Sequence, residues 1–363
     1  MTISIYIVEM IIASILGVIY QNLKDGRLKI VGVISYAISF LITWFISAIR
    51  FGIGTDYFMY KDIYEYAIHG ATTSEIISWY DVEPGWAFLN RILGMLSKDT
   101  QVIFIVTSFI FIFCIYKAIS DFKDDISVGM SIFIFLAIAY IPSFNVVRQY
   151  LAIGILMLSF KYIKDKKLIK FLTIVILASF FHYTALIFLP MYYLLNNNIS
   201  TIKWVVIGTI TILLFLNYNN FIEIMINFVP SFEKYSRYKS SGLLEINKTL
   251  LFLQFSMILI IFISKNFLKN KNIFIYRMTY IYYFSIIFSL LGNMVEFAGR
   301  ASYYFDISQM FFIPAICRFG VKKTNKLIFN KIIIIYYIFY WYINFVYSSN
   351  NGCIPYMSIL NIQ

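Results

Sequence analysis

The sequence predicts an all-α, polytopic helical membrane protein. The mean hydropathy is +0.78 and only 13% of the 363 residues are charged, a combination typical of integral membrane proteins. Apolar stretches recur along the whole chain, and Lys and Arg cluster in the short segments between them. This is the positive-inside pattern, so the net charge of +12 indicates membrane insertion and not nucleic acid as a partner.

The apolar stretches come close to the roughly 17–25 helical residues that a bilayer requires. They cover 3–20, 30–49, 101–119, 126–141, 145–162, 202–217, 249–264, 273–292, 301–317 and 331–347. The first has no basic leader and no small-residue cleavage site, so we expect a retained helix. Without an internal repeat, a low-complexity linker or a soluble domain, we expect residues 1–363 to form a single integral membrane domain.

The stretch 168–195 is either one long helix or two short ones that meet near His182. The charge of the loops favours the second reading. Basic loops lie at 24–29, 161–170, 265–271 and 318–331. All of them can be cytoplasmic only if 168–195 crosses twice, with His182 at the outer turn. We therefore predict about 12 transmembrane segments with both termini outside, and a re-entrant hairpin is the alternative for the two short halves.

This topology leaves two long extracytoplasmic loops, 50–100 and 218–248. Apolar residues recur at helical spacing in the first loop, at Trp86, Leu89, Ile92, Leu93 and Leu96. That spacing predicts an amphipathic helix on the membrane surface. Because long loops in compact domains are commonly functional, we expect both loops to act as lids or substrate platforms.

Four cationic side chains lie at membrane depth or at its edge on the predicted outer side. Arg148 and His182 lie inside or against apolar runs, while Arg50 and Arg300 stand where such runs end. Charge at this depth is costly and usually marks a site for ions or polar substrates. The alternatives are an Arg148 that snorkels to the interface, a His182 that only shapes its turn, and an Arg300 paired with Glu296.

Each of these side chains suits a phosphorylated sugar. The planar guanidinium of Arg148 can bind a phosphate or pyrophosphate through two nitrogens at once. His182 could act as a general base, or as a cation that pairs with a phosphate. Tyr304 falls on the same helical face as Arg300 and could stack on a sugar ring. We therefore expect an anionic amphiphile with a sugar portion as the substrate.

The stretch 50–60 is the most motif-like part of the first outer loop. Gly52 and Gly54 permit close approach of the backbone to a phosphate, and Asp56 is a candidate base or hydroxyl orienter. A structural turn is the alternative, since the Lys-Ser/Thr pair of a nucleotide-binding loop is missing. Two histidines and three cysteines without CxxC spacing predict no metal site, no disulfide and no cofactor.

Several motifs follow one another along the chain in a specific order. They are Arg50-Phe51-Gly52-Ile53-Gly54-Thr55-Asp56-Tyr57 with Tyr60, Glu83-Pro84-Gly85, Val147-Arg148-Gln149-Tyr150-Leu151-Ala152, Phe181-His182-Tyr183-Thr184-Ala185, Arg300 with Tyr304-Phe305, and Ile354-Pro355-Tyr356. This series resembles the EpsG family of polysaccharide polymerases, which are similar in role to the Wzy polymerases of O-antigen and capsule. The resemblance spans nearly the whole chain.

The resemblance implies an enzyme that acts at the outer face of the bacterial plasma membrane. Such proteins join repeat units assembled on undecaprenyl pyrophosphate, in O-antigen, capsule or exopolysaccharide biosynthesis. The partners it implies are this lipid-linked oligosaccharide, the bilayer, a chain-length regulator and a flippase. Catalytic roles are implied for Arg148, His182, Arg300 and Asp56. Substrate contacts are implied for Arg50, Gly54, Tyr57, Glu83, Gln149 and Tyr304.

In this reading Arg148 and Arg300 neutralise the departing pyrophosphate, and His182 or Asp56 takes the proton of the acceptor hydroxyl. Arg50 holds the 52–57 loop or the phosphate of the second lipid carrier. The rival functions are a membrane acyltransferase that modifies polysaccharide and a lipid-linked sugar flippase or transporter. A transporter predicts repeat symmetry and charges through the bilayer centre, and the sequence has neither. The choice of base, the sugar and a retaining or inverting outcome stay open.

Overall fold

The computed structural model describes residues 2–198, 201–217, 248–292, 296–320 and 325–361, with isolated positions between 220 and 233. Helices dominate these residues, and the β pairing described among them is one isolated bridge between Arg50 and Ser358. Five of the described helices are long and apolar enough to cross a membrane: Ile3–Leu23, Lys29–Ala48, Gln101–Asp121, Ile273–Leu291 and Lys326–Tyr347. Shorter apolar helices accompany them. The predicted helical membrane protein is confirmed, and the count of about 12 segments stays a prediction.

Contacts divide the chain into two compact units. Unit 1 comprises Met1–Leu189 and Met310–Gln363, and unit 2 comprises Pro190–Gln309. The single membrane domain expected for residues 1–363 stays a prediction.

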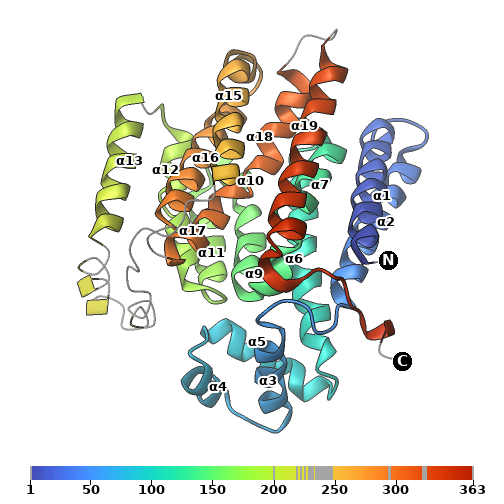
Figure 1. Ribbon diagram of the computed structural model, residues 1–363, viewed down its shortest axis with the longest axis vertical. Helices are drawn as coiled ribbons and strands as arrows, with labels where there is room; N and C mark the ends of the chain where they lie inside the picture. The colour runs from blue at the N-terminus through green and yellow to red at the C-terminus, as the bar shows by residue number, and fades with distance from the viewer. Residues whose placement is uncertain are drawn as a thin grey trace. The chain divides into compact units, whose positions relative to one another are not determined.

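Unit 1 is a helical bundle whose long members pack side by side. Its main helices are α1 (Thr2–Leu23), α2 (Lys29–Ala48), α6 (Gln101–Asp121), α7 (Val128–Phe135), α9 (Val147–Met157), α10 (Ser159–Lys164), α11 (Leu168–Ser179), α18 (Gln309–Phe319) and α19 (Lys326–Trp341). Helix α1 packs on α2 and α7, and α6 packs on α2 and α9 (Figure 1). Small residues permit the α1–α7 contact, because a Cβ on Gly129 would lie 2.6 Å from the Ser14 carbonyl oxygen.

One end of unit 1 collects its basic loops. Lys24 pairs with Asp124, and Lys164 Nζ lies 2.7 Å from Asp125 Oδ2. Arg318 Nη1 donates to the carbonyl of Lys123 at 2.7 Å. Residues 121–126 therefore contact three basic segments, namely the loops 24–29 and 161–167 and the end of α18. This agrees with the expectation that the basic loops lie on one side of the membrane. That this side is cytoplasmic stays a prediction.

The stretch 168–195 is broken at the position that the loop charges favoured. Helix α11 ends at Ser179, and His182 is extended, with φ −157° and ψ 114°. A 3-10 helix, η2 (Tyr183–Phe188), follows and packs back against α11. The next helix is α12 (Met191–Asn196). The turn at His182 agrees with two short segments, while the double crossing stays a prediction.

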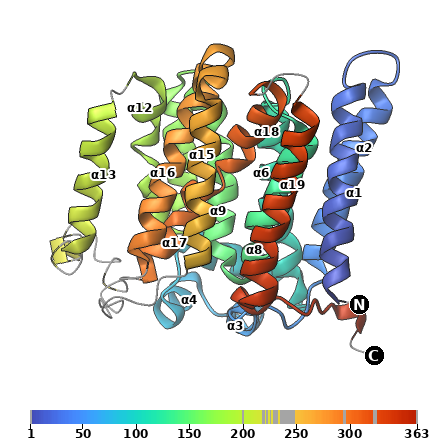
Figure 2. The same cartoon turned by 45° about the horizontal axis from the view of Figure 1, so that its top comes forward.

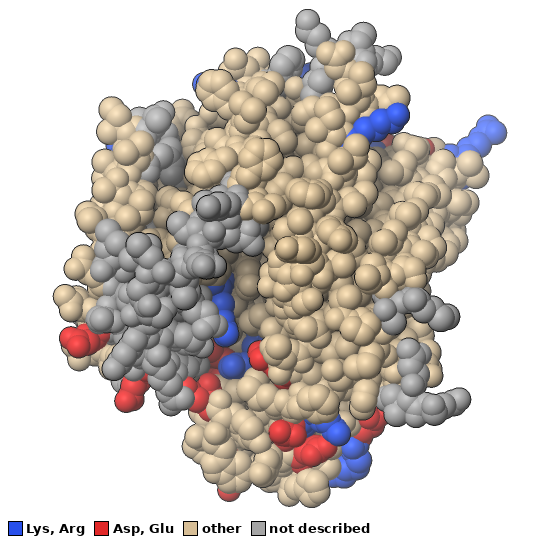
Figure 3. Space-filling model, in the orientation of Figure 1, with Lys and Arg blue, Asp and Glu red and all other residues tan. Residues whose placement is uncertain are grey.

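The first of the two long predicted loops, 50–100, folds into three short helices, α3 (Tyr57–Ile68), α4 (Thr73–Tyr80) and α5 (Pro84–Leu96) (Figures 1 and 2). That it lies outside the cell stays a prediction. Thr72 and Glu75 form a capping box at the start of α4, and Pro84 opens α5. Figure 3 shows the wall of long helices almost free of charged side chains on this face, whereas charged side chains gather over α3 to α5. The charge distribution fits a segment that lies in water beside an apolar bundle.

Helix α5 forms where the apolar spacing predicted a helix, but only part of the predicted stripe is exposed. Trp86 and Leu93 are buried, whereas Ile92 and Leu96 are exposed. The reason is a close contact with α3, since a Cβ on Gly94 would lie 2.9 Å from the carbonyl carbon of Ala67. The exposed apolar stripe, Phe88, Ile92, Met95 and Leu96, remains available to a membrane surface. The second predicted loop, 218–248, lies almost entirely outside the described residues.

Unit 2 packs around α16 (Ile273–Leu291). Helices α12, α13 (Thr201–Leu216), α15 (Lys248–Lys271) and α17 (Glu296–Asp306) all contact α16. The expected single span 301–317 is wrong as one helix, because the chain breaks between α17 and α18 at Ile307 and Ser308. The polar side chain of Asp306 ends α17 there and accepts a hydrogen bond from Gln309 Nε2 at 2.6 Å.

Candidate functional site

The centre of the candidate site is an ion pair between Arg148 and Glu83. Arg148 lies in the first turn of α9, and its Nη1 contacts Glu83 Oε2. The Glu83 side chain is 1% exposed and that of Arg148 is 18% exposed. Burial makes an isolated charge costly, so each group compensates the other. Arg148 Nε is buried and has no hydrogen-bond acceptor in the described part of the chain.

Tyr60 from α3 closes one side of this pair. It is 2% exposed, and its ring packs edge-on against Trp86 at 5.1 Å between centroids. Burial raises the pKa of Tyr60, and the nearby cation of Arg148 partly lowers it. Tyr60 is therefore a neutral hydroxyl at physiological pH. Its contact with Trp86 fixes α3 against the start of α5, where Glu83 is the N-cap residue.

The Glu83-Pro84-Gly85 motif docks on the end of α11. Gly85 N donates to the Phe180 carbonyl at 2.8 Å. A Cβ at position 85 would lie 2.7 Å from that oxygen, so only glycine permits the contact. The contact brings the turn with His182 to the same end of unit 1 as Arg148, in agreement with the packing of η2 on α9.

His182 is held by its own turn. Its Nδ1 lies 2.5 Å from Thr184 Oγ1, and the ring is half-buried. The hydroxyl therefore fixes the orientation of the imidazole, as a positioned general base or acid requires. The same bond is equally compatible with a histidine that shapes the turn, so its catalytic role stays a prediction.

Asn145 holds the glycine-rich loop that follows α2. Its Oδ1 accepts hydrogen bonds from Thr55 Oγ1 at 2.8 Å and from Asp56 N at 2.9 Å. Gly54 has φ +93°, and a Cβ there would lie 3.0 Å from the Phe144 carbonyl oxygen. Asp56 is half-buried and stands directly before α3. The loop thus lies against the residues that precede Arg148.

Arg50 lies beneath this loop and does not face solvent. It is 1% exposed, and its Nη1 donates to the Ser47 carbonyl at 2.6 Å. Its guanidinium lies between two rings, 4.8 Å from the centroid of Phe104 and 4.9 Å from that of Phe144. This placement favours the expectation that Arg50 holds the loop over the one in which it binds a phosphate.

Other residues expected at the substrate are also buried. Tyr57 is 1% exposed and stacks on Phe104 at 4.4 Å between centroids. Gln149 is 1% exposed. Glu83 is buried as well. Contact with substrate stays a prediction for all three residues.

Residues 350–361, here called the closing segment, form backbone hydrogen bonds with the glycine-rich loop that follows α2. Gly54 N donates to the Gly352 carbonyl and Phe51 N to the Met357 carbonyl, each at 3.0 Å. Tyr356 Oη donates to the Ile46 carbonyl at 2.8 Å. The sequence indicated Tyr356 only through the resemblance, and the role of Asn145 was missed, although its polar side chain next to an apolar run was the available signal.

Arg300 and Tyr304 belong to unit 2. Arg300 is half-buried in α17, and Tyr304 is fully buried. The end of α16 approaches α17 closely, since a Cβ on Gly292 would lie 2.6 Å from Gly299 Cα. The side chain of Glu296, the alternative partner of Arg300, lies outside the described residues. Because Arg148 lies in unit 1, joint action of the two arginines stays a prediction.

Among the described residues, no group of three or more His, Cys, Asp or Glu side chains could hold a metal ion. The three cysteines are buried and unpaired.

A sequence model of the EpsG family matches residues 33–358. No curated protein and no solved structure gives a match. The matched range contains the loop after α2, the Arg148–Glu83 pair, the turn at His182, Arg300 and most of the closing segment.

Proposed function

The chain belongs to the EpsG family, and on that basis we propose that it is a membrane polysaccharide polymerase. It joins oligosaccharide repeat units carried on undecaprenyl pyrophosphate, at the outer face of the bacterial plasma membrane. The observation that carries the proposal is the partly exposed Arg148, held by buried Glu83 at the end of unit 1 opposite to the basic loops.

Arg148 binds the pyrophosphate of the donor. Glu83 pairs with Nη1, and the Arg148 side chain is partly exposed. The guanidinium has further N–H donors beyond the one that pairs with Glu83, and these can donate to a phosphate oxygen. The guanidinium has five donors in one plane, so it can hold the carboxylate and a phosphate together.

The transfer reaction then follows from the groups present. An oxygen of the acceptor hydroxyl forms a bond to C1 of the donor sugar, and the bond from C1 to the pyrophosphate oxygen breaks. The pyrophosphate leaves with the electron pair, and Arg148 stabilises the charge that develops on it. His182 or Asp56 accepts the hydroxyl proton.

The remaining residues position this machinery. Glu83 orients Arg148 and lowers the cost of its burial. Asn145 and the closing segment hold the loop that carries Asp56, and Arg50 packs on the ring of Phe144, whose backbone lies against Gly54. Thr184 orients His182. Pre-organisation of this kind is what makes electrostatic stabilisation effective at the moment of reaction.

The proposal is tested by deleting the gene and returning either the wild type, Arg148→Ala or Arg91→Ala. Arg91 is the control arginine because it lies in α5, the helix that begins after Glu83, and is not a member of the ion pair. Surface polysaccharide and lipid-linked oligosaccharides are then separated by length. We expect long polymer with the wild type and Arg91→Ala, and single lipid-linked repeat units with Arg148→Ala. Long polymer in the deletion strain would overturn the proposal.

A further inference from the structure

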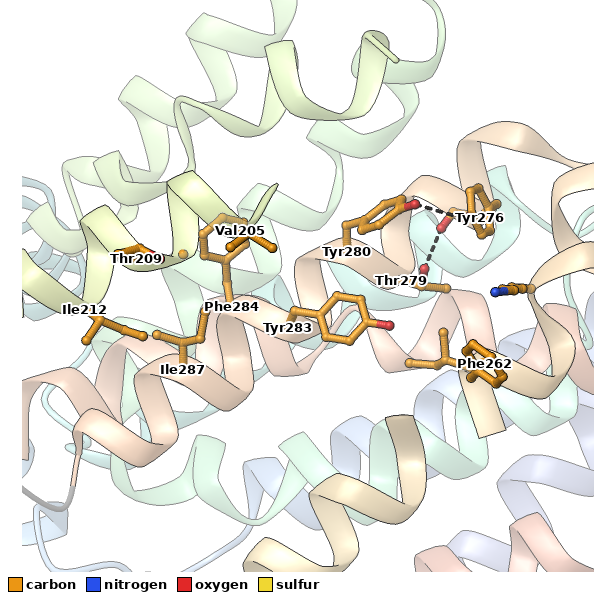
Figure 4. A pocket seen from close by; sticks show the side chains of 13 residues that line it. Val205, Thr209, Ile212, Phe262, Tyr276, Thr279, Tyr280, Tyr283, Phe284 and Ile287 are labelled. Carbon is orange, nitrogen blue, oxygen red and sulfur yellow. Dashed lines mark hydrogen bonds between the residues drawn. The ribbon is translucent and has the colours of Figure 1, made fainter. Parts of the chain in front are cut away.

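Unit 2 contains a cavity between three of its helices. It has a volume of about 500 Å³ and lies between α13, α15 and α16 (Figure 4). Ligand sites for small molecules usually have volumes of roughly 300–1,000 Å³ and mostly apolar walls with a few polar groups. The size and the lining of this cavity both fit that description.

The lining changes from polar to apolar along α16. At one end, Tyr276 and Tyr280 share a hydrogen bond of 2.8 Å between their hydroxyls, close to Thr279 (Figure 4). Lys265 lines the cavity too, with its Nζ 4.0 Å from the centroid of the Phe262 ring. At the other end the walls are aliphatic, with Ile212 and Ile287 (Figure 4). The cavity therefore suits an amphiphile with its polar group near Lys265.

The charge at the polar end is positive. Lys265 belongs to the basic loop 265–271, and Lys269 and Lys271 lie in the last turn of α15. Arg277 is near the start of α16 and donates to the Leu195 carbonyl at 2.9 Å. Basic pockets between membrane helices on the cytoplasmic side bind anionic lipid headgroups, and the positive-inside rule predicts that side for this loop.

The polar end lies far from Arg300. Gly292, which contacts Gly299 beside Arg300, follows the last residue of α16, whereas Tyr276 is near the first. At 1.5 Å per residue, these ends of α16 are roughly 20 Å apart. A pyrophosphate bound near Arg300 is therefore out of reach of Lys265. The ligand of this cavity is a different molecule from the donor of the proposed reaction.

We propose that the cavity binds an anionic glycerophospholipid of the surrounding bilayer, with its phosphate beside Lys265 and an acyl chain along α16 toward Ile287. The lipid fills the space between α13 and the α15–α16 pair. It thereby contacts all three of these helices.

The test measures lipid binding to the purified full chain, independently of polymer formation. Native mass spectrometry is used with phosphatidylglycerol, and with phosphatidylcholine of the same acyl chains. We expect one phosphatidylglycerol per chain, bound in preference to phosphatidylcholine. Lys265→Gln should weaken binding about fivefold, the effect of losing one lysine near a phosphate. Lys170→Gln, in α11 of unit 1, should leave binding unchanged.

Ile287→Trp provides the second variant, because it fills the apolar end without changing charge. We expect it to abolish binding while thermal unfolding in detergent shows that the chain remains folded. Equal binding of the two phospholipids would overturn the proposal, as would unchanged binding in Ile287→Trp. Displacement of phosphatidylglycerol by an equal concentration of a polyprenyl phosphate would also overturn it, since the site would then belong to the carrier lipid.

Discussion

Glu83 and Arg148 form an ion pair that joins the start of α5 to the start of α9, with the carboxylate almost completely buried. The pair connects the short helices α3 to α5 to the bundle of unit 1. It also presents a partly exposed arginine that is paired with a buried carboxylate.

Replacing Arg148 by lysine should distinguish the effect of the positive charge from the effect of the planar shape of the guanidinium. Lysine keeps the positive charge but lacks the planar fork that can hold Glu83 and a phosphate together. We expect Arg148→Lys to lower the rate of polymer formation about 100-fold, the usual loss when one charge-stabilising donor is removed. Membrane insertion should be normal, as judged by the amount of protein in the membrane fraction. Wild-type polymer from this variant would exclude a bidentate role.

Replacing Glu83 by glutamine should mainly affect stability. The substitution leaves Arg148 as an uncompensated charge in a largely buried place, which costs about 3 kcal/mol. The thermal midpoint in detergent should fall accordingly. The double variant Glu83→Gln with Arg148→Met should be more stable than Glu83→Gln alone and still inactive. If Glu83→Gln unfolds at the wild-type temperature, the pair does not hold the two helices together.

Gly54 should tolerate alanine less well than Gly70 does. Both have positive φ, +93° and +98°, so alanine costs about 1–2 kcal/mol at either position. A Cβ at 70 meets nothing within 4 Å, whereas at 54 it meets the Phe144 carbonyl at 3.0 Å. We expect Gly54→Ala to lower polymer yield and Gly70→Ala to leave it near normal. Equal yields would mean that the close approach of the loop to residue 144 is unimportant.

His182 and Asp56 can be separated by the pH dependence of the purified enzyme. The variant that lacks the true base should lose the decline of activity toward acid pH as well as most of the rate. The comparison is between His182→Ala and Asp56→Asn, with Thr184→Val as a test of ring orientation. If His182 is the base, Thr184→Val should lower the rate less than His182→Ala and keep the pH profile. Wild-type polymer length and yield in His182→Ala would assign this residue to structure alone.

The closing segment should be required for activity but not for insertion. A chain that stops after Ser349 loses the hydrogen bonds from Phe51, Gly54 and Tyr356. We expect rapid proteolysis within residues 49–57 and no long polymer, with the helices of unit 2 as resistant as in the wild type. Tyr356→Phe removes a single hydroxyl and should retain most activity. Normal polymer from the shortened chain would contradict the role given to this segment.

Much of the helical framework is predictable, because long apolar runs at membrane length leave few alternatives. The break at His182 was also predictable, since the loop charges require it. The break at Ile307 was not, because it depends on Asp306 finding donors in Ser285 and Gln309, a tertiary arrangement. The burial of Trp86 and Leu93 in α5 was missed for a similar reason, because contact with α3 decides which apolar residues of this helix are buried.

The sequence predicted which residues lie at the site better than it predicted what each residue does there. The motifs with Glu83, Arg148 and His182 do converge at one end of unit 1. Arg50 could not be distinguished from a phosphate ligand by sequence, because the rings of Phe104 and Phe144 that enclose it come from distant parts of the chain. Asn145 carried no motif, and its importance comes only from the loop folded against it.

The pairing of residues 49–54 with residues 352–359 has a consequence for biosynthesis. The ribosome makes the first stretch about 300 residues before the second. The loop that carries Asp56 therefore cannot form these hydrogen bonds until the last helix of unit 1 has been synthesised and inserted. An incomplete chain released during translation would carry Arg148 and His182 but lack an organised loop. If the loop is needed for catalysis, as proposed, activity should begin only when synthesis of unit 1 is finished.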